Sequence, residues 1–163
     1  MPNMHETTRL KADIVPFTVE YSRVVHSWID SEETYRNLCR GTEFPPPDDL
    51  VDSWQREGIA AYLLFSAGKL VAYGELWDRP LERAVEIAHL IVAPACRLQG
   101  YGSKMLELLY QRAAAREHVA KVMLNFFGSD AAALGCYLKA GFELVGSTRV
   151  VPGLRMERLV RIK

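Results

Sequence analysis

The clearest pattern of apolar and polar positions along the chain lies between residues 84 and 117. Residues 84–93 form an apolar run rich in β-branched side chains, and Pro94 closes it, which predicts a buried strand. Further along, apolar side chains recur at helical spacing with polar residues opposite them: Met105, Leu106, Leu109 and Ala113. The pattern therefore predicts a strand, a glycine-containing loop and an amphipathic helix that extends to about residue 117.

The residues before this unit predict a strand, three helices and a hairpin. In chain order these are a strand at 10–15, helices at 20–29, from Asp30 to about 39 and from Asp48 or Asp49 to about 57, and strands at 60–66 and 70–77. Asp30 with Glu33 forms a capping box for the second helix, and the three prolines of 41–47 predict an extended loop after it.

The residues after the unit predict a strand at 121–127, a helix capped by Ser129 or Asp130, and two strands at 142–151 and 154–162. The three middle strands can form an antiparallel meander. The link from strand 84–93 to strand 121–127 contains a full helix, which fits a parallel crossover. The order predicts an α/β (α+β) fold, a three-layer sandwich whose central sheet of about seven strands is mixed and mainly antiparallel.

Composition predicts one domain over residues 1–163, in which 1–7 form a flexible tail. The formal net charge is zero, which argues against nucleic-acid binding, and no apolar run reaches the roughly 18 residues that a membrane span needs. The three cysteines are odd in number and lack metal-ligand spacing, so we expect free thiols, no metal and a cytoplasmic location. A homodimer is left open.

The loop between the central strand and its helix has the features of an anion site. It contains Arg97-x-x-Gly100-x-Gly102-Ser103. The first turn of a helix presents free N–H groups, and the helix dipole favours negative charge there. Because glycine has no Cβ, a phosphate can approach the backbone closely at residues 100 and 102.

Two motifs at the expected separation resemble those of the GNAT superfamily of N-acetyltransferases. The first is the strand–loop–helix with Arg97-x-x-Gly100-x-Gly102, which resembles the acyl-CoA-binding motif. The second lies between Leu124 and Phe142, where the superfamily has a capped helix carrying a tyrosine and then Gly-Phe. Here these are Asp130, Tyr137, Gly141 and Phe142, with Asp130 at a position where Asn is usual. The resemblance covers about residues 8–162 and implies the acyl-CoA N-acyltransferase fold.

The resemblance implies acetyl-CoA as cosubstrate and assigns residues to it. The loop amides would bind the pyrophosphate, beside Arg97: Leu98, Gln99, Gly100, Tyr101, Gly102 and Ser103. Backbone groups of Leu90, Ile91 and Val92 would bind the pantetheine arm as an added strand. Asp130 would cap the second motif helix. Tyr137 would be the general acid that protonates the departing thiolate, since a phenol keeps its proton at neutral pH.

The general base has three candidates. Glu86 lies eleven residues before Arg97, which matches a glutamate of the superfamily's histone-modifying branch. His89 lies three residues after Glu86 and would face the other side of a regular strand, although a bulge could change that. Glu75, on the neighbouring strand, is the third candidate. The branch that acetylates ribosomal-protein N-termini has a catalytic Glu where this chain has Asn125, which argues against that branch.

The acceptor pocket is expected from residues 28–54 and the turn 78–82. That region mixes three aromatic residues with five carboxylates: Tyr35, Phe44 and Trp54, with Asp30, Glu32, Glu33, Asp48 and Asp49. The carboxylates either attract a cationic amine or cap helices and face solvent.

Two functions remain. One is an enzyme that transfers acetyl from acetyl-CoA to a primary amine of a small molecule or peptide, by direct attack in a ternary complex. The other is a non-catalytic acyl-CoA-binding sensor or interaction module. Retention of both Glu86 and Tyr137 favours the enzyme, because a binder needs only the loop. The expected partners are acetyl-CoA and an amine acceptor, without nucleic acid or membrane.

Overall fold

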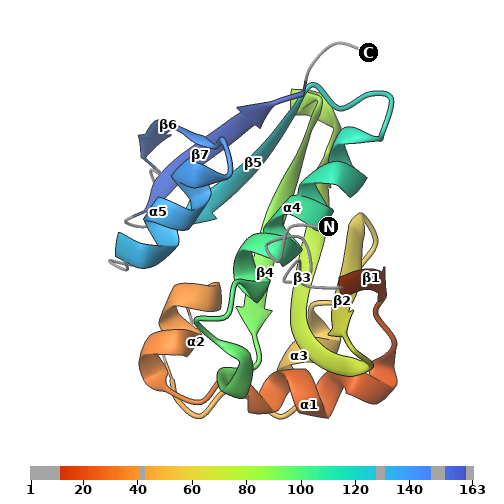
Figure 1. The fold of residues 1–163 in the computed structure, drawn as a ribbon, viewed down its shortest axis with the longest axis vertical. Coiled ribbons are helices and arrows are strands. Elements are labelled where there is room, and N and C mark those ends of the chain that lie inside the picture. Colours follow the sequence, from red (N-terminus) through yellow and green to blue (C-terminus); the bar gives the residue numbers. More distant parts are fainter. Residues whose placement is uncertain (1–11, 41–42, 128–130, 148–152, 161–163) are drawn as a thin grey trace, which may run out of the picture.

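The computed structural model describes residues 12–40, 43–127, 131–147 and 153–160. Figure 1 shows the order of its helices and strands. They are β1 (Ala12–Pro16), α1 (Ser22–Ser27), α2 (Glu32–Cys39), α3 (Leu50–Ser53), β2 (Ile59–Ser66), β3 (Lys69–Arg79), β4 (Ala84–Val92), α4 (Tyr101–Ala114), β5 (Lys121–Phe126), α5 (Ala131–Lys139), β6 (Glu143–Ser147) and β7 (Leu154–Leu159). Short 3₁₀ turns occur at Val19–Tyr21, Pro80–Glu82 and Pro94–Cys96.

The strands form one seven-stranded sheet in the order β1-β2-β3-β4-β5-β7-β6. Strands β1 to β4 are antiparallel neighbours, as are β5, β7 and β6. Only β4 and β5 are parallel, with α4 as the crossover between them. This confirms the predicted mixed, mainly antiparallel sheet flanked by helices.

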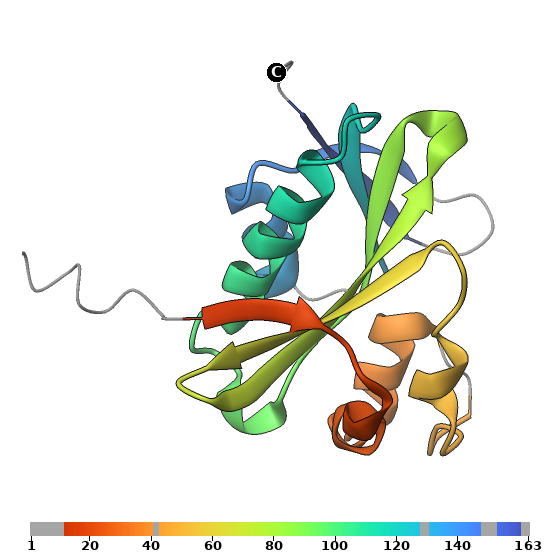
Figure 2. The ribbon, with the colours of Figure 1, turned by 90° about the vertical axis from the view of Figure 1, so that its right-hand side faces the viewer.

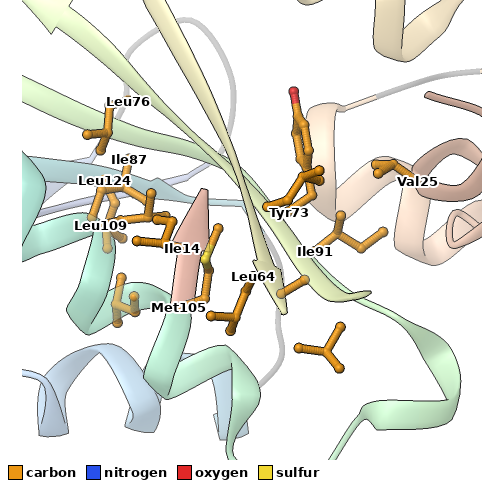
Figure 3. Close-up of a cluster of buried hydrophobic side chains, with 14 of the residues drawn as sticks. Ile14, Val25, Leu64, Tyr73, Leu76, Ile87, Ile91, Met105, Leu109 and Leu124 are labelled. Carbon is orange, nitrogen blue, oxygen red and sulfur yellow. The ribbon is translucent and has the colours of Figure 1, made fainter. Parts of the chain in front are cut away.

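Helices cover both faces of the sheet, as Figure 2 shows. Helix α4 packs on β3 and β4 from one side, and α1, α2 and α3 lie on the other side. The core is correspondingly divided in Figure 3, where Met105 and Leu109 of α4 lie apart from Tyr73 and Val25. Because successive strand side chains point to opposite faces, β3 contributes to both halves of the core.

Three N-terminal elements differ from the predicted ones. The helix expected at 20–29 is interrupted, because residues 19–21 form a 3₁₀ turn and only 22–27 are α-helical. The predicted Asp30–Glu33 capping box is wrong by one residue, since Ser31 is the N-cap and its hydroxyl accepts the Thr34 N–H at 3.0 Å. Helix α3 begins after Asp49 as expected, but it ends at Ser53 and not near 57.

Two elements that lead into the site also differ in length. Strand β3 extends to Arg79, two residues beyond the predicted end, because it continues to pair with β4 as far as Ala84. Helix α4 ends at Ala114 and not near 117. At the C-terminal side, α5 ends before Gly141, whose φ of 92° is left-handed as in a glycine C-cap. The predicted caps Ser129 and Asp130, and residues 148–152, lie outside the described residues.

Candidate active site

A β-bulge in β4 determines which side chains meet at the centre of the sheet. Glu75 pairs with Ala88 and Tyr73 pairs with Ile91, so two residues of β4, His89 and Leu90, lie opposite Gly74 alone. His89 has a left-handed φ of 48°, which is rare for a residue with a side chain. A regular strand would place His89 and Glu86 on opposite faces, but the bulge brings both into the lining of one pocket.

Glu75 lies at the centre of a buried hydrogen-bond network. Its side chain has no exposed surface. Oε1 accepts hydrogen bonds from Trp77 Nε1 at 2.7 Å and from His89 Nδ1 at 2.8 Å, and Oε2 accepts one from the Tyr73 hydroxyl. Both oxygens are engaged, so Glu75 has no direct path to a substrate.

This network fixes the tautomer and orientation of His89. Carboxylate oxygens accept hydrogen bonds, so Nδ1 of His89 is the donor in this contact and Nε2 is the ring nitrogen that Glu75 leaves free. The ring also stacks on Trp54, with 4.0 Å between centroids and 23° between planes. Trp77 contacts it edge-on at 5.3 Å. No hydrogen bond to Nε2 occurs within the described part of the chain.

Tyr73 completes the network from the core of the protein, where its side chain is fully buried. Burial raises the pKa of its hydroxyl, and the charge of Glu75 raises it further. The hydroxyl therefore holds its proton more tightly than an ordinary tyrosine, and it receives a hydrogen bond from Gln55 Nε2 at 3.0 Å. Gln55 also donates to the Val51 carbonyl at 3.0 Å, which ties α3 to the network.

Glu86 lies on the same face but has a different partner. Its side chain is 8% exposed, and Oε1 accepts a hydrogen bond from the Arg79 guanidinium at 2.9 Å. Arg79 also lies over the Trp77 ring, with 5.5 Å from Cζ to the centroid. The carboxylate of Glu86 is thus neutralised by a half-exposed arginine at the end of β3.

The parallel strands β4 and β5 separate beyond their first four residue pairs. β4 pairs with β5 only over Ala84–Ile87, although it pairs with β3 as far as Val92. Figure 1 shows the two strands diverging toward α2. Within the described residues no strand pairs with the β5-facing edge of 88–92, so this edge presents backbone groups to a ligand.

A cleft of about 440 Å³ follows this divergence, and we call it the β4–β5 cleft. It is lined by Glu33, Thr34, Asn37, Leu38, Leu90, Ile91, Val92, Arg97, Asn125, Phe126, Phe127, Ala133 and Tyr137. The three β4 residues predicted to bind the pantetheine arm, 90–92, therefore lie along one wall. Tyr137 of α5 lies on the opposite wall, where its ring contacts Phe126 edge-on at 6.0 Å.

The loop before α4 has the backbone shape that an anion site needs. Leu98 and Gly100 are both left-handed, with φ of 61° and 89°, and Gly100 is the helix N-cap. The N–H groups of the first helical turn, from Tyr101 on, lack helical partners by geometry. Gly102 packs against Val92, since a Cβ there would lie 3.7 Å from its methyl group. Gly100 thus permits the left-handed turn before α4, whereas Gly102 permits close packing of α4 against Val92 of β4.

The Arg97 side chain links the start of the loop to two other segments of the chain. Nε donates to the Val92 carbonyl at 3.3 Å, and one terminal nitrogen donates to the Trp28 carbonyl at 3.1 Å. The other terminal nitrogen lies 3.5 Å from Asp30. The guanidinium therefore joins the end of α1 to the end of β4, and it lines the cleft from that position.

A second pocket, of about 240 Å³, opens on the other side of His89, and we call it the β3–β4 pocket. It is lined by Leu38, Cys39, Arg40, Trp77, Arg79, Glu86, Ile87, Ala88, His89, Asn125 and Phe127. A smaller cavity of about 60 Å³ is bounded by His89, Asn125 and Tyr137. The cavity shares Leu90 and Tyr137 with the cleft and His89 with the pocket, and Asn125 lines all three, so the cavity adjoins both larger spaces.

The structure brings only part of the predicted site residues together. Glu86, His89, residues 90–92, Arg97 and Tyr137 line the cleft, the pocket or the cavity, whereas Glu75 and the loop residues 98–103 line none of the three, and Asp130 lies outside the described residues. Of the five carboxylates expected near an acceptor, only Glu33 lines any of these spaces, and it lines the cleft. Glu32 pairs with Arg36.

Arg40 and Arg79 fall within the two ranges from which an acceptor pocket was predicted, 28–54 and 78–82, but sequence reasoning did not single out either arginine. Strand β3 reads Tyr73-x-Glu75-x-Trp77-x-Arg79, and this alternation was the available signal for Arg79. In the part of the chain that the structure describes, no group of three metal-ligating side chains gathers at one point. No described helix is long and apolar enough to cross a membrane.

Comparison with known proteins agrees with this geometry. Residues 25–142 match the model of the Acetyltransferase (GNAT) family. Among solved structures, an aminoglycoside acetyltransferase in complex with coenzyme A has a TM-score of 0.75 and 19% identity, over 91% of this chain and 95% of that one. A spermidine N-acetyltransferase from Vibrio cholerae, with CoA and spermine, has a TM-score of 0.73 and 16% identity, over 92% and 96%.

A ribosomal-protein alanine N-acetyltransferase from Escherichia coli has a TM-score of 0.70 and 21% identity, over 93% of this chain and 96% of that one. These likenesses concern the fold, while the family match covers well over half of the chain. The chain therefore belongs to the Acetyltransferase (GNAT) family.

Proposed function

We propose that the protein transfers an acetyl group from acetyl-CoA to a primary amine, by direct attack while both substrates are bound. One observation carries this proposal: His89 and Tyr137 line the same small cavity between the β4–β5 cleft and the β3–β4 pocket. A base and an acid on the two sides of one reaction centre are what acyl transfer to an amine requires.

The β4–β5 cleft fits the cosubstrate. The pantetheine arm would lie along the β4 edge at Leu90, Ile91 and Val92, where β5 has diverged. The pyrophosphate would be held by backbone N–H groups of residues 98–103, at the beginning of a helix of 14 residues. This arrangement points the thioester into the cavity beside Tyr137.

His89 is the best placed of the three candidate bases. Glu75 has both oxygens engaged, and Glu86 is paired with Arg79. The Nε2 atom of His89 takes a proton from the protonated amine, directly or through one water. The free amine attacks the thioester carbonyl, and the zwitterionic intermediate collapses by breaking the C–S bond. The departing thiolate takes the proton of the Tyr137 hydroxyl, and the second N–H proton of the intermediate passes through water to the tyrosinate, which leaves N-acetylated amine, CoA thiol and a restored Tyr137.

Thiol release from acetyl-CoA with a panel of amines tests this function. We expect at least one amine to support turnover, and His89→Gln to lower kcat by about 10²–10⁴-fold with partial recovery at high pH, where solution supplies free amine. Glu86→Gln should have the smaller effect. If acetyl-CoA binds in calorimetry but no amine releases thiol, the chain is a non-catalytic acyl-CoA-binding module. If Glu86→Gln has the larger effect, the base is Glu86.

A further inference from the structure

The β3–β4 pocket is lined by more positively than negatively charged side chains. Its charged side chains other than His89 are Arg40, Arg79 and Glu86. Glu86 accepts a hydrogen bond from Arg79, so these two charges offset each other. Arg40 forms no ion pair within the described residues. The pocket therefore carries one positive charge that no carboxylate of the described chain balances.

Arg40 is also held in place. It follows α2 directly as its C-cap, with a left-handed φ of 58°, and its backbone N–H donates to the Arg36 carbonyl at 2.8 Å. Its guanidinium lies over the Phe127 ring, with 4.8 Å from Cζ to the centroid. Stacking occupies one face of a guanidinium and leaves its edge, which carries the N–H donors, free to bind an anion.

We infer that the acceptor is a primary amine that also carries a carboxylate, and that Arg40 binds this carboxylate. The inference rests on the proposed function and adds the substrate class to it. An arginine–carboxylate pair has two parallel hydrogen bonds, which fix the orientation of the ligand as well as its charge. With the carboxylate on Arg40, the pocket turns the amine toward His89, which lines its inner wall.

The same charges disfavour polycationic acceptors. A polyamine or an aminoglycoside would bring several positive charges against two guanidinium groups and a single, already paired carboxylate. Specificity is a difference of affinities, and like-charge contact is one of its sources. The carboxylates of residues 30, 32, 48 and 49, which could attract a polycation, do not line the pocket.

Matched acceptors test the inference. Phenylalanine, leucine and lysine would each be compared with the amine that lacks only the carboxylate, and spermidine would be included, with thiol release as the readout. We expect kcat/KM to favour at least one carboxylated member about tenfold or more over its partner. Arg40→Gln should remove this preference, because it lowers kcat/KM for the carboxylated member relative to its carboxylate-free partner, and it should leave the affinity for acetyl-CoA unchanged. Arg36→Gln, on the same helix but paired with Glu32 on the surface, is the matched control and should retain the preference.

Product binding separates this inference from the proposed function. Calorimetry on the CoA-loaded protein would compare N-acetylphenylalanine with N-acetylphenethylamine, and likewise for the other two pairs. About tenfold tighter binding of a carboxylated product, lost in Arg40→Gln, supports the inference even if no amine is turned over. Three results would overturn the inference, whether or not acetyl transfer occurs. The first is that both members of every pair are acetylated and bound equally well. The second is a preference for spermidine, and the third is a preference for the carboxylated member that survives Arg40→Gln.

Discussion

The imidazole of His89 and the indole of Trp54 are stacked, with 4.0 Å between their centroids. Trp54 is the C-cap of α3, a helix of only four residues, so a short element far from β4 in sequence holds one face of the ring. Glu75 holds its edge through Nδ1. A ring fixed at a face and at an edge keeps Nε2 in one direction, which is the requirement for a positioned base.

Glu75→Gln should impair this positioning. The amide nitrogen would meet at least one of the three donors that now point at the carboxylate, from Tyr73, Trp77 and His89. We expect kcat to fall about 10–100-fold, a scale typical of groups that orient a ligating or catalytic histidine. KM for acetyl-CoA should change little, and the pH profile of kcat should shift.

Trp77→Phe is the comparison for Glu75→Gln, because it removes one donor and keeps the carboxylate. It should retain more activity than Glu75→Gln. A merely structural role for Glu75 would lower thermal stability in both variants and leave the pH profile of the remaining activity unchanged.

Tyr73 should make the protein less stable in strong alkali. Burial first, and then the charge of Glu75, raises the pKa of Tyr73, while the unfolded chain ionises near pH 10. The folded state thus holds the proton more tightly, so the stability from this group is complete below pH 10 and is lost as pH rises above it. The slope is about 1.4 kcal/mol per pH unit.

Denaturant unfolding at pH 8 to 11 measures this effect as the stability difference between wild type and Tyr73→Phe. The difference should be constant up to pH 10 and then change in favour of the variant. A difference that does not vary over the whole range would mean that Tyr73 ionises as readily in the folded protein as in the unfolded chain.

Gly100→Val should weaken acetyl-CoA binding more than tenfold. Gly100 has a φ of 89°, so a β-branched residue would strain the loop, and its methyl groups would occupy the space where a phosphate approaches the amides. Calorimetric titration with CoA gives the affinity. Gly58→Val is the matched control, because Gly58 has a φ of 83° and an added Cβ would meet no atom within 4 Å. Equal loss of binding in both variants would assign the effect to general destabilisation.

Tyr137→Phe should lower kcat about 10–100-fold and leave the affinity for acetyl-CoA within about twofold, since a hydroxyl that protonates the thiolate acts mainly in the transition state. The phenyl ring retains the edge-on contact with Phe126. Rate assays of thiol release give kcat, and calorimetry gives the affinity for acetyl-CoA, so the two effects can be measured separately. Equal losses in both, or none in either, would limit Tyr137 to packing.

Local patterns predicted the elements that depend on local sequence. The apolar run of 84–92, the glycine loop and α4 follow from periodicity and turn chemistry, and all three are found in the predicted order, although α4 ends about three residues early. The face to which His89 points does not follow in this way. It depends on a bulge, and a bulge is set by how β4 pairs with β3 across the sheet.

The pocket was hard to predict for a related reason. Arg40 and Arg79 come from the end of a helix and the end of a strand, and the ends of elements are where sequence patterns are weakest. Two of the expected acidic residues pair with arginines outside the pocket, Asp30 with Arg97 and Glu32 with Arg36. Contacts between segments distant in sequence therefore determine which charged side chains line the β3–β4 pocket, and composition alone does not reveal them.

Gly74 has a consequence for both halves of the site. A Cβ there would lie 2.7 Å from the Leu109 side chain of α4, and the other side of the same residue faces the bulge that carries His89. The missing side chain lets α4 approach the sheet at the very point where β4 bends outward. A larger residue at 74 would first displace the ends of two side chains, Leu109 Cδ1 at 2.7 Å and Leu90 Cδ1 at 3.3 Å from its Cβ. Leu109 belongs to the helix that follows the glycine loop, and Leu90 belongs to the bulge beside His89, so a change at this one position reaches both halves of the candidate site.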